Sequence, residues 1–217
     1  MVKNIKIDDE LEKYIIEHSY ELHPVQKEII KHNNGLGDIK RMQISVSQGH
    51  FFQLFIKACN INTILEIGTF TGYSALSMGL CSPNAKITCL DVNQKTSEEA
   101  KKFFKKAKLD KNINIIVGPA LNTLEKLKKE NKVFDMIFID ADKENYVKYY
   151  NLSMNILKKK GYILIDNVLW RGDVVDATNA DGLTKIIRKF NAFVKKDNRV
   201  DKTILPIGDG LTICRKI

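Results

Sequence analysis

Short apolar runs alternate with longer amphipathic segments along most of this chain. Apolar runs of about four to eight residues predict buried strands, whereas apolar residues at i, i+3, i+4 and i+7 predict helices. Ala100, Phe103, Phe104 and Ala107 follow the helical spacing, with lysines on the opposite face. Alternating strands and helices are typical of a parallel α/β sheet. We expect its strands at Ile64–Ile67, Lys86–Asp91, Ile113–Val117, Val133–Asp140 and Gly161–Asp166.

Helices are expected before and between these strands. Residues Asp8–Asn33 look helical, with Pro24 opening a second segment, and Ser47 is placed to cap a third helix with a wide apolar face. A loop is expected at Asn33–Asp38. The later helices are expected over about 71–80, around Ala100–Ala107, over Leu121–Lys129, from Tyr146 onward and through Leu183–Val194.

The chain is expected to end in a hairpin. Val200–Leu205 and Leu211–Arg215 are separated by the short turn Pro206–Gly210, which favours an antiparallel pair. The pattern therefore predicts a seven-stranded, mostly parallel sheet with helices on both faces, closed by a C-terminal antiparallel hairpin. No linker interrupts it, so residues 1–217 are expected to form one domain, in which the helices of 1–60 act as a lid or interface and 61–217 form the core.

A glycine turn follows the first strand. Leu65–Leu76 reads as a buried strand that ends in a turn and opens directly into a helix. Glu66 breaks the apolar run, and a buried carboxylate is costly without a partner. Gly68 and Gly72 allow the backbone to bend and a ligand to approach closely. Such a turn, with helix N–H groups facing the strand end, predicts a nucleotide-sized pocket.

Asp91 strengthens this interpretation. It ends the second strand about 20 residues past the turn, where a carboxylate can bind both hydroxyls of a ribose. The glycines are spaced G-x-x-x-G rather than G-x-G-x-x-G, which makes a nicotinamide cofactor less favoured. The pattern predicts a nucleoside site.

Acidic residues also follow the fourth and fifth strands. Because the carboxyl ends of neighbouring parallel strands lie side by side, Asp140, Asp166 and Asn167 can converge as oxygen ligands of Mg²⁺ or a similar cation. The alternative is that the two aspartates only cap the next helices. Lys143 lies about one turn beyond Asp140 and is either an exposed lysine or, beside a cation, a base.

The formal net charge is +9, which raises a nucleic-acid partner as an alternative. The lysine pairs and the triplet at 158–160 are expected on helix exteriors and near helix ends, without interleaved aromatic residues, so solvated helix faces account for them better. A phosphate-bearing substrate remains compatible with this charge. The histidines (His18, His23, His32 and His50) are expected to be structural or surface residues.

Other sequence features point to an ordinary globular protein. No apolar run approaches the roughly 20 residues of a membrane span, and Met1–Glu12 lacks a signal-peptide core, so no membrane partner and a cytoplasmic location are expected. The four cysteines form no C-x-x-C pair and are expected to be reduced, mostly buried thiols: Cys59, Cys81, Cys89 and Cys214.

Five motifs together resemble one known family. They are L-E-I-G-T-F-T-G-Y-S (65–74), G-P-A (118–120), F-I-D-A-D-K (138–143), D-N-V-L-W-R-G (166–172) and L-P-I-G-D-G-L-T-I-C-R (205–215), and Asp91 falls between the first two. In this order and spacing they resemble the cation-dependent O-methyltransferases of the caffeoyl-CoA and catechol type, from about Met42 to the C-terminus. The resemblance implies a Rossmann-like class I methyltransferase fold and S-adenosylmethionine as cofactor.

The resemblance also implies roles for individual residues. It implies that Asp140, Asp166 and Asn167 bind a divalent metal (Mg²⁺, or Mn²⁺ or Ca²⁺) and that Lys143 is the base. Met42, Trp170 and Arg171 would border the acceptor, and Arg171 stands where plant members usually have Asn. The implied cofactor-binding residues are Ile44, Glu66, Gly68, Thr69, Ser74, Asp91, Ala120, Asp140 and Asp142.

The implied reaction is transfer of a methyl group to a hydroxyl of a catechol-type acceptor. A vicinal diol chelates the metal, which lowers the phenol pKa from about 10, and Lys143 takes the proton. The acceptor is a caffeoyl-CoA-like ester or a small phenolic, and the family implies a homodimer. Two alternatives remain: a nucleic-acid methyltransferase, and a non-catalytic S-adenosylmethionine-binding protein. The F-I-D-A-D-K motif disfavours the first, and the complete Asp140, Lys143, Asp166 and Asn167 set disfavours the second.

Overall fold

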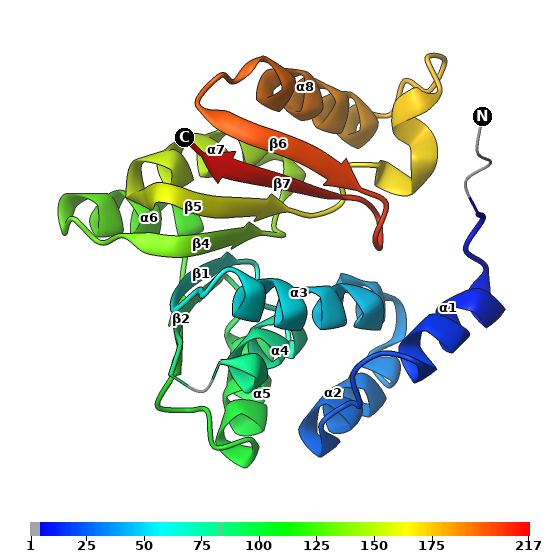
Figure 1. Ribbon diagram of the computed structural model, residues 1–217, viewed down its shortest axis with the longest axis vertical. Helices are drawn as coiled ribbons and strands as arrows, with labels where there is room; N and C mark the ends of the chain where they lie inside the picture. Colours follow the sequence, from blue (N-terminus) through cyan, green and yellow to red (C-terminus); the bar gives the residue numbers. More distant parts are fainter. Residues whose placement is uncertain (1–4, 83) are drawn as a thin grey trace.

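The computed structural model describes residues 5–82 and 84–217, which contain one seven-stranded sheet in the order β3-β2-β1-β4-β5-β7-β6 (Figure 1). β1 to β5 pair in parallel, and β7 is antiparallel to both β5 and β6. The predicted sheet and its closing hairpin are confirmed. The strands are β1 (Thr63–Ile67), β2 (Lys86–Asp91), β3 (Ile113–Val117), β4 (Phe134–Ile139), β5 (Leu157–Ile165), β6 (Val200–Leu205) and β7 (Leu211–Lys216).

The strand order reverses between β1 and β4. The chain builds β1, β2 and β3 towards one edge and then returns to add β4 and β5 on the other side of β1. In open α/β sheets, such a switch point leaves a crevice at the carboxyl ends of the strands, where ligands bind. The fold therefore puts the ends of β1, β2, β4 and β5 where the motifs predicted chemistry.

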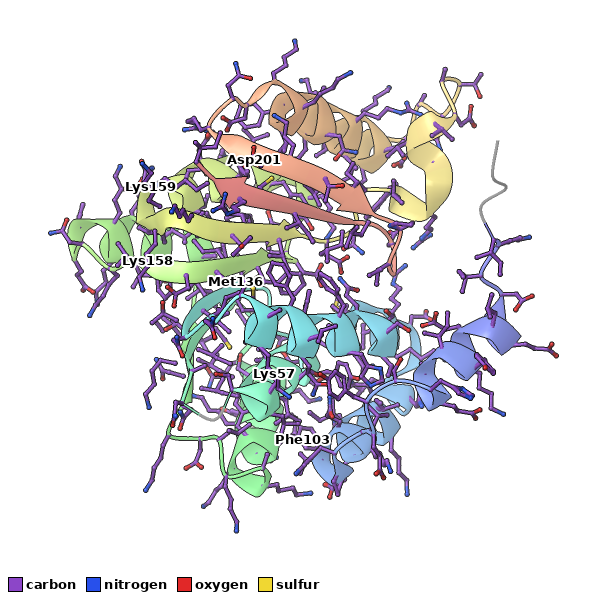
Figure 2. The ribbon with its side chains drawn as sticks, viewed as in Figure 1. Lys57, Phe103, Met136, Lys158, Lys159 and Asp201 are labelled. Carbon is purple, nitrogen blue, oxygen red and sulfur yellow. The ribbon has the colours of Figure 1, made fainter. Side chains whose placement is uncertain are left out.

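Helices cover both faces of the sheet (Figure 1). Side chains alternate along β4: Met136 and Phe138 pack in the layer with α3, α4 and α5, whereas Ile137 and Ile139 pack against α6, α7 and α8. Figure 2 shows side chains filling both layers, with Met136 on the α3 side. The helices are α1 (Asp9–Glu17), α2 (Pro24–Asn34), α3 (Val46–Ala58), α4 (Tyr73–Cys81), α5 (Gln94–Lys106), α6 (Ala120–Lys129), α7 (Tyr146–Ile156) and α8 (Gly182–Lys196). Three short 3-10 segments complete them: η1 (Gly37–Met42), η2 (Lys143–Asn145) and η3 (Trp170–Val175).

The cap predicted for α3 was wrong by two residues. Ser45 is the N-cap, and its hydroxyl accepts a hydrogen bond from the backbone N–H of Gln48 over 3.1 Å. Ser47 lies inside the first turn and donates to Glu12 of α1 instead. Both serines stand before the same apolar helix, so position alone does not distinguish them. The helix after the glycine turn likewise begins at Tyr73, two residues later than expected.

β5 begins four residues earlier than predicted. Leu157 is 3% exposed and pairs with Phe134, and the register shifts before Tyr162 pairs with Met136. The exposed lysines 158–160, two of which are labelled in Figure 2, therefore lie in a strand just after the end of α7 and not on a helix exterior. Lys158 forms an ion pair with Asp135. Three consecutive lysines mask a strand because they remove its apolar alternation.

The N-terminal helices differ in how firmly they pack. α3 contributes Phe52 and Ile56 to the core, whereas α1 buries none of its residues. α2 is tied to α4 by a hydrogen bond of 2.8 Å from Gln26 to Ser77, and His23 caps α2. Cys89 and Cys214 are buried free thiols and Cys59 and Cys81 are half-buried free thiols. Within residues 5–82 and 84–217, no helix is long and apolar enough to cross a membrane.

Candidate functional site

Four strand ends meet at one edge of the sheet. The residues that follow the strands continue the ladder: Gly68 N–H donates to the Leu90 carbonyl over 2.8 Å, and Asp140 N–H donates to the Ile67 carbonyl over 2.8 Å. Asp166 N–H donates to the Ile139 carbonyl over 3.0 Å. The glycine turn after β1, Asp140 after β4 and Asp166 after β5 are thereby held side by side, as the sequence predicted.

The glycine turn is shaped first by packing against protein. Gly68 has φ +91°, and a Cβ there would lie 1.9 Å from the backbone oxygen of Asp140. Gly72 has φ +88°, and a Cβ there would lie 2.7 Å from the Phe104 ring. Packing against neighbouring protein atoms is therefore the first constraint on these glycines, before any approach of a ligand. They are required because neighbouring protein atoms approach the backbone this closely.

Glu66 is fully buried directly before the turn. Its Oε1 accepts a hydrogen bond of 2.5 Å from the Ser74 hydroxyl on α4, and its Oε2 has no hydrogen-bond partner among the described residues. Burial raises the pKa of Glu66 to about 7, and the Ser74 bond opposes that shift. An unpaired carboxylate oxygen at this depth is suited to a polar or cationic ligand group.

Asp91 already has partners within the protein. Its Oδ2 accepts hydrogen bonds from the backbone N–H groups of Thr69 over 2.9 Å and Phe70 over 2.8 Å, and its Oδ1 accepts one from Asn93 over 2.8 Å. The sequence predicted only a ribose ligand here. The structure adds a role in holding the turn, in which Oδ2 accepts two hydrogen bonds and Oδ1 accepts one, so one lone pair on Oδ1 is left for a ligand hydroxyl.

Lys143 is the centre of a second cluster. Its Nζ lies 3.2 Å from Asp140 Oδ1, 2.7 Å from Asn167 Oδ1 and 2.6 Å from the Tyr146 hydroxyl oxygen. The lysine side chain is only 12% exposed. The sequence alternative of an exposed first-turn lysine is therefore wrong.

Asp166 lies beside this cluster and is 3% exposed. Burial, reinforced by the charge of Asp140, raises the pKa of Asp166 to about 7. Burial also raises the pKa of Asp140, against the opposing effect of Lys143. The alternative that these aspartates only cap helices is wrong, because the N-cap residues of the helical segments that follow them are Asp142 for η2 and Leu169 for η3.

The donor set suits a hard divalent cation. Asp140 and Asn167 direct oxygens at one cationic atom, the Lys143 nitrogen, and Asp166 adds a buried carboxylate next to them. Oxygen donors of this kind favour Mg²⁺, Mn²⁺ or Ca²⁺. In the described parts of the chain no group of three His, Cys, Asp or Glu side chains could hold a metal, so a site here depends on the amide of Asn167.

The remaining predicted residues differ in their contacts and exposure. The Asp142 carboxylate accepts hydrogen bonds of 2.5 Å from Tyr149 and from Asn145. Ala120 begins α6 just beyond β3. Ile44 is buried, whereas Met42 is 56% exposed.

The loop after β5 carries the other two predicted acceptor residues. Trp170 and Arg171 begin η3 with φ of +48° and +57°. Arg171 N–H donates to the Asp209 carboxylate over 2.5 Å, which ties this loop to the turn between β6 and β7.

Three residues at the site were not assigned from sequence. Tyr146 bonds Lys143, and the charge of Asp209 acts to raise the pKa of Asp140. Gln48 of α3 is 1% exposed and packs against Gly208. It lies near enough to Asp166 to lower the pKa of that carboxyl. The Nε2 of Gln48 has no hydrogen-bond partner among the residues described. Tyr146 and Asp209 lie within or beside quoted motifs, whereas Gln48 carries no local sequence signal.

Comparison with known proteins agrees with this geometry. A family model described as O-methyltransferase matches residues 16–217. The chain is 37% identical over 217 residues to the "Probable caffeoyl-CoA O-methyltransferase 1" of Dictyostelium discoideum, covering 98% of this chain and 94% of that protein. It is 36% identical over 232 residues to the caffeoyl-CoA O-methyltransferase of Medicago sativa, covering 99% and 92%.

A solved structure shares the fold over the whole chain. The SAH-bound Podospora anserina methyltransferase PaMTH1 superposes with a TM-score of 0.88 at 27% identity, covering 100% of both chains. The family model thus matches nearly the whole chain, including the glycine turn and the residues at the strand ends. This protein belongs to the O-methyltransferase family.

Proposed function

We propose that this protein transfers a methyl group from S-adenosylmethionine to one hydroxyl of a catechol-type acceptor, with a divalent cation bound by Asp140, Asp166 and Asn167. The observation that carries the proposal is the position of Lys143, whose Nζ lies between Asp140 Oδ1 and Asn167 Oδ1. A basic group and a set of oxygen ligands therefore share one small, partly buried space beside the glycine turn.

The glycine turn is the proposed cofactor site. Glu66, with its unpaired Oε2, and Asp142 are suited to the amino-acid part of the cofactor, and Asp91 to its ribose. Gly68 and Thr69 belong to the same turn and Ser74 to the start of α4, and the remaining proposed contacts are Ala120, Ile44 and Asp140. The SAH-bound structure of PaMTH1 supports this choice of cofactor.

The reaction requires an acceptor hydroxyl to lose its proton as its oxygen bonds to the methyl carbon and the carbon–sulfur bond breaks. A phenol has a pKa of about 10, so it is mostly protonated near neutral pH. When bound, the divalent cation supplies Lewis-acid stabilisation of the deprotonated hydroxyl and orients the vicinal oxygens. Lys143 takes the proton, while the turn and the loop after β5 hold the two reactants in line.

The acceptor pocket is proposed to lie between η1 and the loop after β5. Met42, Trp170 and Arg171 belong to these two segments. The Medicago relative is named for a caffeoyl-CoA acceptor. For this chain both a CoA ester and a free catechol remain candidate acceptors. We also propose that residues 1–217 form one domain and that two copies form a homodimer.

The decisive experiment compares matched acceptors. Purified protein with S-adenosylmethionine and Mg²⁺ is assayed on catechol, caffeate and caffeoyl-CoA, and on phenol and guaiacol, which lack a free vicinal diol. We expect methylation of at least one diol and a rate at least 100-fold lower on the two monohydroxyl compounds. Equal rates on both groups contradict chelation of a diol. Methylation of RNA or DNA without any diol activity favours the alternative raised by the net charge of +9.

A further inference from the structure

Tyr146 connects the lysine to the loop that carries Asp166. It is the first residue of α7 and is fully buried, with its ring packed edge-to-face against Phe190 at a centroid distance of 5.3 Å. Its hydroxyl lies 2.6 Å from Lys143 Nζ and 3.1 Å from the backbone oxygen of Asp166. The packed ring places the hydroxyl at a defined point between the two residues.

The direction of each hydrogen bond follows from proton counting. A tyrosine hydroxyl has one proton, and the carbonyl of Asp166 can only accept, so Tyr146 donates there. Its oxygen must then accept from Lys143. The lysine ammonium has three protons and three acceptors, namely Tyr146, Asn167 and Asp140.

These three acceptors differ in one respect. Asp140 and Asn167 are proposed ligands of a divalent cation, whereas the Tyr146 hydroxyl is not. A cation and the lysine nitrogen therefore compete for the same two oxygens. Tyr146 is the acceptor that stays with Lys143 when the other two bind the cation.

We propose that Tyr146 is a positioning residue: its hydroxyl holds the Lys143 nitrogen beside the acceptor hydroxyl while Asp140 and Asn167 bind the cation. This inference rests on the proposed function. Loss of the hydroxyl is expected to leave the cation's own ligands as the only hydrogen-bond acceptors of Lys143, since a phenylalanine keeps just the ring, whose centroid lies 4.7 Å from the lysine nitrogen. The lysine should then compete more strongly for these ligands and lie less often where it takes the proton.

Tyr146→Phe removes only the hydroxyl, and Tyr150→Phe is the matched control. Tyr150 lies on the same helix, is also fully buried and packs on the same Phe190 at 6.2 Å. Its hydroxyl is 3.0 Å from Asp197, outside the proposed site. Tyr146→Phe loses two hydrogen bonds and Tyr150→Phe loses the bond to Asp197, each from a fully buried tyrosine, so a general loss of stability affects both variants.

Two measurements test the proposal. Calorimetric titration with Mn²⁺ alone is expected to show binding at least threefold weaker in Tyr146→Phe than in wild type. Steady-state kinetics are expected to show kcat at least tenfold lower, with KM for both substrates within about twofold. Tyr150→Phe should match wild type in both measurements.

The outcomes separate this inference from the proposed function. A wild-type enzyme that binds Mn²⁺ and methylates a diol, with Tyr146→Phe equal to it in metal affinity and kcat, overturns the role of Tyr146 and leaves the proposed function standing. Equal losses in Tyr146→Phe and Tyr150→Phe also overturn it. Wild-type protein with no metal binding and no metal-dependent turnover overturns both proposals.

Discussion

The Asp91 carboxylate accepts a hydrogen bond of 2.8 Å from the backbone N–H of Phe70, 21 residues earlier in the chain. Phe70 has φ +52°, which is an uncommon conformation for a side chain of this size. The same oxygen also accepts from Thr69. Asp91 therefore stabilises the conformation of the turn in which the proposed cofactor binds, in addition to its proposed contact with the ribose.

Replacing Asp91 with Ala should weaken cofactor binding through both roles. Hydrogen bonds to a charged group contribute about 1.5–3 kcal/mol each, so we expect S-adenosylmethionine affinity to fall at least tenfold and the free energy of unfolding to fall by at least about 2 kcal/mol. Calorimetric titration and urea unfolding measure these quantities. Asp110→Ala, at an exposed position, is the control. Unchanged affinity in Asp91→Ala would contradict both roles.

Glu66 should make stability depend on pH. Its pKa is about 7 in the folded protein and 4.5 ordinarily, so between these values the unfolded carboxyl ionises while the folded one keeps its proton. The unfolded state then binds fewer protons, and stability falls as pH rises. The stability that protonated Glu66 contributes is therefore complete below about pH 4.5 and lost above about pH 7.

The variant Glu66→Gln isolates this effect. In cofactor-free protein, the stability of wild type relative to Glu66→Gln should fall by on the order of 2–3 kcal/mol between pH 4.5 and 8. Urea unfolding across this range measures the difference, with the exposed Glu130→Gln as control. Parallel pH profiles for wild type and Glu66→Gln would show that folding does not raise the pKa of Glu66.

The sheet and the strand-end residues were predictable because both follow from local sequence. Apolar runs marked the strands, and parallel pairing brings Asp140 and Asp166 together whatever the helices do. The start of β5 was less predictable, because lysines 158–160 interrupt its apolar pattern. The pairing of this part of β5 also involves a register shift against β4, which the local sequence does not indicate.

Contacts between distant segments explain what the sequence did not predict. Gln48 approaches Asp166 only because α3 packs against the hairpin turn at Gly208. Tyr146 was assigned to a helix face, and its bonds to Lys143 and Asp166 require the actual orientation of α7. Asp91 was assigned to a ligand, whereas its first partners are the backbone N–H groups of the turn.

Alanine substitutions at two aspartates should affect metal binding and cofactor binding separately. We expect Asp166→Ala to lower kcat at least 100-fold and leave S-adenosylmethionine affinity within about threefold of wild type. Asp142→Ala should instead weaken S-adenosylmethionine binding, because this carboxylate is oriented by Tyr149 and Asn145 beside the glycine turn. Calorimetric titrations with Mg²⁺ and with S-adenosylmethionine measure both affinities. The opposite pattern, with Asp166→Ala losing the cofactor and Asp142→Ala losing Mg²⁺, would reverse the assignment.

The central claim is that Asp140, Asp166 and Asn167 bind a cation that the methyl transfer requires. The most direct measurement is the initial rate of transfer from labelled S-adenosylmethionine to a diol acceptor, in protein freed of metal with EDTA and then titrated with Mg²⁺. We predict a rate at least 100-fold lower without metal, full recovery with excess Mg²⁺, and no recovery in Asp166→Ala. An undiminished rate in protein shown to contain no bound metal would contradict the claim.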